Sequence, residues 1–161
     1  MISHLSHLDD QGKARMVDVT LKDPTLREAT ASGKVSMNKE TAAMINQKGL
    51  PKGDVLSTAR IAGIMAAKKT PELIPLCHPL ELTDIDLRFS VDAKHGLVDI
   101  EATVRSLSRT GVEMEALTAV SAAALTIYDM CKSADREMVL SDIKLISKKG
   151  GKSGPFIRKN I

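Results

Sequence analysis

Residues 85–91, Ile-Asp-Leu-Arg-Phe-Ser-Val, and residues 98–104, Val-Asp-Ile-Glu-Ala-Thr-Val, decide the fold class of this chain. In both stretches apolar and polar side chains alternate, which predicts two strands that each bury one face. The short connection over residues 92–96 has a length typical of a hairpin, so the two strands should be antiparallel.

Helical periodicity on both sides of this hairpin supplies elements that could cover the buried face. Residues 39–45 are helix formers that follow the N-cap residue Asn38, and residues 54–69 carry small apolar side chains at helical spacing until Thr70-Pro71. The longest apolar segment, residues 112–134, contains no proline and predicts a central helix.

Three further segments are predicted strands because they are rich in β-branched residues: residues 16–19, 26–37 and 138–146. Strands and helices therefore come in mixed order around one clear hairpin. This order favours an α+β fold, a mostly antiparallel sheet covered by helices on one face.

The length of 161 residues is that of one domain, and we expect residues 1–161 to form a single one, with a flexible N-terminus over about residues 1–12 and a C-terminal tail over about residues 149–161. No apolar run approaches the roughly 20 residues that span a bilayer, and no secretory leader is visible. With only Cys77 and Cys131, no disulfide framework is needed, so we expect a cytoplasmic protein without membrane contact.

The net charge of +3 is mild, but the lysines near the C-terminus could concentrate positive potential on one anionic ligand. Nucleic-acid modules commonly add aromatic stacking platforms to a basic surface, and this chain has no Trp, one Tyr and two Phe. A phosphate-bearing small molecule is therefore favoured over a nucleic acid.

Two predicted loops hold candidates for acid–base chemistry. Lys52 precedes a helix and is either a surface lysine or a proton-transfer group whose pKa is lowered by burial or by a second cation. His78 lies on a loop constrained by two prolines and could exchange protons or bind phosphate, or be satisfied by backbone. Cys77 lacks further ligands at zinc spacing, so no metal site is predicted.

Four charged residues lie on the central helix or at its end. Asp129 and Lys132 share a face, as a structural ion pair or as an aspartate that tunes a catalytic lysine. Glu113 and Glu115 point to different faces at the helix start. There they could interact favourably with the helix dipole, or one of them could accept hydrogen bonds from a purine-like edge.

The segment Gly150-Gly151-Lys152-Ser153-Gly154 ends like a phosphate loop, but the earlier glycine and the following helix that such a loop requires are missing. We therefore reject an NTPase. A glycine and lysine tail that closes over a triphosphate and a merely disordered tail both stay open.

Taken together, these segments resemble the MoaC family, the cyclic pyranopterin monophosphate synthases of molybdenum cofactor synthesis. The resemblance covers residues 12 to about 154 in order. The segments that carry it are Met16-Val17-Asp18-Val19, Lys52-Gly53-Asp54-Val55, Ala59-Arg60-Ile61-Ala62-Gly63-Ile64, residues 73–80 (Leu-Ile-Pro-Leu-Cys-His-Pro-Leu), residues 110–118 (Thr-Gly-Val-Glu-Met-Glu-Ala-Leu-Thr), residues 125–132 (Leu-Thr-Ile-Tyr-Asp-Met-Cys-Lys) and residues 150–154.

The resemblance implies a ferredoxin-like protomer and a homohexamer, a trimer of dimers with active sites between protomers. It also implies a lyase that converts 3′,8-cyclo-7,8-dihydroguanosine 5′-triphosphate, the product of a radical SAM GTP cyclase, into cyclic pyranopterin monophosphate and pyrophosphate. No cofactor is required, although Mg²⁺ could accompany the triphosphate.

The resemblance also implies roles for single residues. Lys52, Lys132, Asp129 and His78 would be catalytic, with the two lysines as acid and base. The substrate pocket would be lined by Leu76, Cys77, His78, Glu113, Met114, Glu115 and Lys148. To these we add Arg27 and Lys152, because a triphosphate leaving group needs positive charge.

Two other classes compete with this enzyme. A noncatalytic oligomeric nucleotide carrier would bind the same ligand without turnover. An RNA-binding module would lose affinity steeply with salt, and the scarcity of aromatic residues disfavours it.

Overall fold

The predicted hairpin forms one half of the sheet. In the computed structural model, which describes residues 7–9, 11–47 and 53–159, β2 (Leu82–Asp92) pairs antiparallel with β3 (Leu97–Ser108). The two strands remain paired up to the turn, where Asp92 is opposite Leu97. The antiparallel hairpin from which the fold class was predicted is therefore confirmed.

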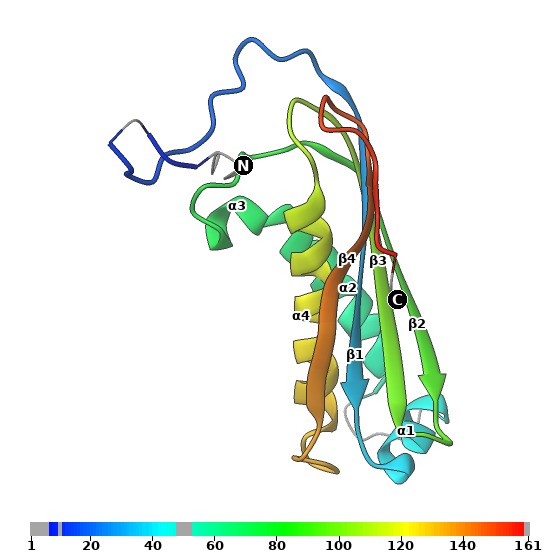
Figure 1. Ribbon diagram of the computed structural model, residues 1–161. Coiled ribbons are helices and arrows are strands. Elements are labelled where there is room, and N and C mark those ends of the chain that lie inside the picture. The colour runs from blue at the N-terminus through cyan, green and yellow to red at the C-terminus, as the bar shows by residue number, and fades with distance from the viewer. Residues whose placement is uncertain (1–6, 10, 48–52, 160–161) are drawn as a thin grey trace.

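β1 (Thr25–Ser36) lies between β3 and β4 (Val139–Lys149), antiparallel to both. A short β5 (Phe156–Ile157) pairs with β4, so the order across the sheet is β2-β3-β1-β4-β5 (Figure 1). Without β5 this is the interleaved order of a ferredoxin-like fold. The prediction of an α+β fold with an antiparallel sheet is confirmed.

Two capped helices follow β1. α1 (Lys39–Asn46) begins after Asn38, whose side chain accepts a hydrogen bond from the Thr41 backbone N–H at 2.8 Å. α2 (Val55–Lys68) begins after Asp54, which accepts one from the Ser57 N–H at 3.0 Å. Both predicted helices are confirmed, with Asn38 as the predicted N-cap.

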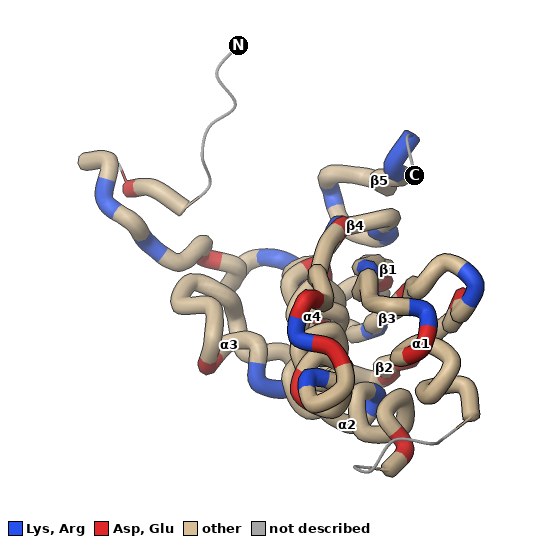
Figure 2. Tube along the Cα trace, turned by 90° about the horizontal axis from the view of Figure 1, so that it is seen from below, with Lys and Arg blue, Asp and Glu red and all other residues tan. Residues whose placement is uncertain are grey.

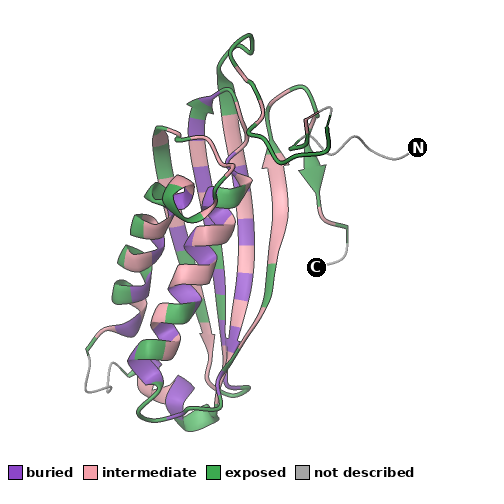
Figure 3. Cartoon of the chain, turned by 90° about the vertical axis from the view of Figure 1, so that its left-hand side faces the viewer, coloured by how far each residue is buried: buried purple, intermediate pink, exposed green. Residues whose placement is uncertain are grey.

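The central helix α4 (Glu113–Cys131) packs beside α2, and both cover the same face of the sheet (Figure 3). The short helix α3 (Thr70–Leu73) follows α2 at once, with a proline in its first turn. The sequence reading expected the helical pattern to stop there, but proline is tolerated in the first turn of a new helix.

Two terminal segments differ from the predicted strand pattern. Residues 16–19 form no strand, because β-branched composition alone does not provide a neighbouring strand edge, and the segment instead runs over one end of the sheet. At the other terminus, β4 continues to Lys149, and β5 follows in a region for which no strand was predicted.

The two faces of the sheet differ as the alternation requires. On the face under the helices the side chains of Ala29, Ala31, Val98 and Ile100 are buried. Small residues on α4 allow the helix to approach this face closely.

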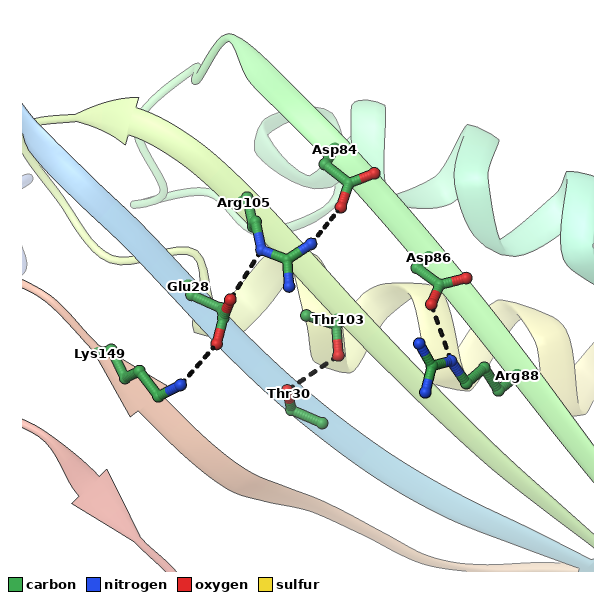
Figure 4. Close-up of polar contacts among 8 residues, drawn as sticks. All are labelled: Glu28, Thr30, Asp84, Asp86, Arg88, Thr103, Arg105 and Lys149. Carbon is green, nitrogen blue, oxygen red and sulfur yellow. Dashed lines mark hydrogen bonds and ion pairs between the residues drawn. The ribbon is translucent and has the colours of Figure 1, made fainter.

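The opposite face carries a polar network (Figure 4). Arg105 donates to Glu28 at 2.7 Å and also contacts Asp84, while Lys149 lies 3.1 Å from the second Glu28 oxygen. These hydrogen bonds, from Arg105 first and then Lys149, lower the pKa of Glu28. These side chains stand at directly opposed positions of neighbouring strands and so link β2, β3, β1 and β4.

No helix in the described part of the chain combines the length and the apolar character needed to cross a membrane.

We expect Gly63→Ala to lower the free energy of unfolding by about 1–3 kcal/mol. A Cβ at Gly63 would lie 2.5 Å from Leu87 Cδ2 and 2.9 Å from the Ala119 carbonyl oxygen, and the backbone of α4 cannot yield as a flexible side chain can. This cost should exceed the gain of roughly 1 kcal/mol in helix propensity. The measurement is denaturant unfolding, with Ser57→Ala on the exposed side of α2 as a control of near-zero effect. A stabilised Gly63→Ala variant would contradict the close packing of α2 on α4.

Candidate active site

A cavity of about 930 Å³ opens at the end of the sheet where β1 begins and β4 ends. Four segments from distant parts of the sequence form its walls: the N-terminal segment, the loop after α3, the start of α4 and the turn after β4. In Figure 1 this is the upper end, where these segments converge above the strands.

The cavity brings together every residue that the sequence analysis assigned to substrate binding. All nine line its wall: Arg27, Leu76, Cys77, His78, Glu113, Met114, Glu115, Lys148 and Lys152. They come from β1, the loop after α3, the first turn of α4, β4 and the turn after it. Their common location follows from the topology, since, apart from β4 and the turn after it, no two of these segments are neighbours in the sequence.

An ion pair joins the two sides of the cavity. Lys148 Nζ lies 2.9 Å from Glu113 Oε1, with both side chains about a quarter exposed, and donates to Ser153 Oγ at 3.3 Å. The Glu113 carboxylate occupies the space over Gly111, where a larger residue would collide with it. β4 and α4 are therefore tied together at the cavity.

Glu115 is the most deeply buried carboxylate of the cavity, with 3% of its surface exposed. Burial, and then the charge of nearby Glu113, raise its pKa to about 7. Burial and the charge of Glu115 also raise the pKa of the Cys77 thiol. At neutral pH, Glu115 can thus either donate or accept a proton, whereas Cys77 is a neutral thiol.

Arg27 is fixed against the carbonyl groups at the end of β3. Its Nε donates to the Ser108 carbonyl at 3.2 Å and Nη2 to the Arg109 carbonyl at 3.1 Å. Carbonyl groups carry no net charge, so the guanidinium keeps its full positive charge for an anion. Gly150 and Gly151, at φ +92° and +85°, pass so close to Leu26 and Arg27 that a Cβ would collide with them.

His78 is half-buried and hydrogen-bonded to the N-terminal segment. Its Nε2 lies 2.7 Å from the Val17 carbonyl oxygen. The loop that carries His78 lies between Pro75 and Pro79 and is irregular, as predicted.

Two of the remaining predicted catalytic residues, Asp129 and Lys132, lie elsewhere. Asp129 is on the last turns of α4, which rises about 1.5 Å per residue, so it is about 21 Å from Glu115 along the helix axis. Lys132 Nζ is 2.7 Å from Asp129 Oδ1, and Figure 2, from the opposite end of the molecule, shows acidic and basic residues around this end of α4. Lys52 falls outside the described residues.

The Asp129–Lys132 pair is exposed, with about half of each side chain accessible. The hydrogen bond and charge of Asp129 raise the pKa of Lys132, which favours the ammonium form. A second hollow of about 420 Å³ lies here, lined by Lys132, Tyr128, Ser133 and Arg136. One chain thus holds two separate groups of candidate residues.

Sequence reasoning missed several residues of the cavity wall. Val17 and Val19 reach it from the N-terminal segment, and Arg109 lines it while donating to the Lys22 carbonyl at 2.8 Å. Val17 and Val19, the β-branched residues for which a strand was predicted, are half-buried between exposed neighbours.

Within the described ranges, no three His, Cys, Asp or Glu residues are grouped so that they could hold a metal ion.

Comparisons with known proteins agree on one family. The model of the MoaC family matches residues 16–151. A protein of Roseiflexus sp. (strain RS-1) is 61% identical over 97% of this chain and 99% of its own length, and one of Heliobacterium modesticaldum is 59% identical over 96% and 98%. One of Pelotomaculum thermopropionicum is 61% identical over 98% and 93%. All three are named cyclic pyranopterin monophosphate synthase.

The raised pKa of Glu115 predicts a pH dependence of stability. Between the ordinary value of 4.5 and about 7, the unfolded chain has lost the Glu115 proton that the folded chain keeps. The contribution of Glu115 to folding is therefore most favourable below pH 4.5 and is lost as pH rises through 7, by at most about 3 kcal/mol.

Glu115→Gln should remove this dependence, so the difference in unfolding free energy between variant and wild type should grow in favour of the variant from pH 5 to 8. Urea unfolding at several pH values measures it, and Glu101→Gln, on the exposed side of β3, is the matched control. A difference independent of pH would show that Glu115 titrates normally.

Proposed function

Because the chain belongs to the MoaC family, we propose that it is a cyclic pyranopterin monophosphate synthase, a lyase of molybdenum cofactor biosynthesis. Its substrate would be 3′,8-cyclo-7,8-dihydroguanosine 5′-triphosphate and its products cyclic pyranopterin monophosphate and pyrophosphate. The observation that carries this proposal is identity of about 60% over nearly the whole chain to proteins of that name.

The chemistry of the cavity suits such a substrate. Arg27, Lys148 and Lys152 place positive charge at one side, where the triphosphate would lie and pyrophosphate would leave. Glu115 offers an acceptor, or a donor when protonated, to the purine-derived edge. The rearrangement needs successive proton transfers, for which we propose His78, Lys52 and Lys132, with Asp129 as the carboxylate partner of Lys132.

We further propose that the active site is shared between protomers. Glu115 and Asp129 are about 21 Å apart along one rigid helix, too far to act on one substrate molecule in the same chain. Apposition of two chains would bring the end of α4 in one to the cavity of the other.

The proposed assembly is the homohexamer, a trimer of dimers. Ile61 and Met65, one turn apart on α2, and Leu125 on α4 are each more than half exposed, which suits contact with other copies.

The setting of the reaction follows the same resemblance. We propose that the substrate comes from a radical SAM GTP cyclase and that the reaction takes place in the cytoplasm, which suits Cys77 as a free thiol. We also propose that no cofactor is required, with Mg²⁺ accompanying the triphosphate where present.

The first test is turnover. Wild-type protein incubated with the cyclic dihydro-GTP substrate should release pyrophosphate and form the pterin product, and Asp129→Asn should lower kcat by about 100-fold or more. Asp99→Asn, an exposed aspartate on β3, is the matched control and should retain activity. Tight substrate binding without product by the wild type would favour the carrier function instead.

The shared site is tested by subunit mixing. Asp129→Asn and Glu113→Gln alter different residue groups, so each variant alone should be inactive. In mixed oligomers about a quarter of the sites would combine two unaltered groups, and activity should recover to that fraction of wild type. The control is an assay that contains both variants under conditions that prevent subunit exchange. No recovery after demonstrated exchange would place both groups in one chain.

A further inference from the structure

The hydrogen bond between His78 and Val17 determines where the imidazole carries its proton. Nε2 lies 2.7 Å from the Val17 carbonyl oxygen, and a carbonyl oxygen can only accept a hydrogen bond. Nε2 must therefore be the donor in this contact. The neutral His78 ring is therefore the Nε2–H tautomer.

The same contact leaves Nδ1 as the nitrogen that exchanges protons. Nε2 carries hydrogen in both the neutral ring and the imidazolium, so titration adds or removes hydrogen only at Nδ1. Within the described part of the chain Nδ1 makes no hydrogen bond, and His78 lines the cavity. A ligand in the cavity could therefore meet the basic nitrogen.

We infer that His78 acts on the substrate through Nδ1, and that the Val17 carbonyl is the positioning group that fixes the ring for this role. This inference rests on the proposed function. In the forward step the Nδ1 lone pair takes a proton from a substrate N–H or O–H group, and the bonding electron pair stays on the substrate atom. The resulting imidazolium is stabilised by the Val17 carbonyl dipole and later returns the proton to the substrate.

The bond has a second consequence, for the N-terminal segment. Val17 and Val19 are half-buried, while Met16 before them and Asp18 between them are exposed, so the segment presents its valines to the cavity. Its attachment at Val17 is the contact with His78. The histidine thus holds one wall of the site in place as well as exchanging protons.

The tautomer can be observed without turnover. A long-range ¹H–¹⁵N correlation spectrum of the intact protein, labelled in its histidine rings, should show His78 with a protonated Nε2 and an unprotonated Nδ1 at high pH. The chain has four histidines, and the His78 signal is the one that disappears in His78→Gln. On acidification only the ¹⁵N chemical shift of Nδ1 should change strongly. A His78 ring protonated at Nδ1 and bare at Nε2 would overturn the inference.

Two variants separate the functions of the two nitrogens. The longer Gln side chain in His78→Gln can place its amide N–H at the position of Nε2 and keep the bond to Val17, whereas the shorter Asn in His78→Asn cannot reach. Both lack the Nδ1 base, so both should lose about 100-fold or more in kcat. Only His78→Asn should release the N-terminal segment.

Release is measured by trypsin cleavage after Lys13 and Arg15, both exposed, with cleavage after Lys94 in the β2–β3 turn as the internal control. We expect faster cleavage at the first two sites in His78→Asn and wild-type rates in His78→Gln. Full activity of His78→Gln would exclude Nδ1 as the working atom, and unchanged cleavage of His78→Asn would exclude the tether. Lack of turnover by the wild type would refute the proposed function alone, since the spectrum and the cleavage rates need no substrate.

Discussion

The pairing of β1 with strands on both sides is the constraint on which the rest of this structure depends. β1 is the first strand in the sequence, but in the sheet it lies between β3 and β4. It pairs with β3 along its whole length, from Thr25 to Ser36. The chain can complete this order only by crossing the sheet twice through helices. Both crossovers lie on one face, and the connections between elements therefore meet at the two ends of the sheet (Figure 1).

This arrangement explains why charged residues can gather at the cavity without a motif in the sequence. Arg27 at the start of β1 and Lys148 at the end of β4 become neighbours because the two strands are antiparallel, with Ala29 opposite Lys148. The start of α4 brings Glu113 and Glu115 to the same end. The network of Glu28, Arg105 and Lys149 on the outer face holds the same strand ends together (Figure 4).

Local patterns in the sequence predicted the hairpin, the long helices and the order of elements, because alternation and helical periodicity report directly on which side chains are buried. They failed at residues 16–19, where the half-burial of Val17 and Val19 comes from the cavity and not from a sheet, and at β5, whose two residues are too short for a pattern. Seven of the nine cavity residues were named through the resemblance, and Arg27 and Lys152 were added because a triphosphate needs positive charge. Their convergence depends on strand order, which no local pattern encodes.

The separation of Asp129 from Glu115 was, in contrast, open to prediction, because a helix predicted over residues 112–134 already puts them about 21 Å apart. In one chain the Asp129–Lys132 pair is exposed, and its aspartate raises the pKa of the lysine, which opposes service as a base near neutral pH. In a shared site the cations Arg27 and Lys148 of another copy, together with burial, would act on Lys132 in the opposite direction. Assembly would then bring all the proposed site residues together, and it would also lower the pKa of Lys132 toward a value at which the lysine can take up and release protons.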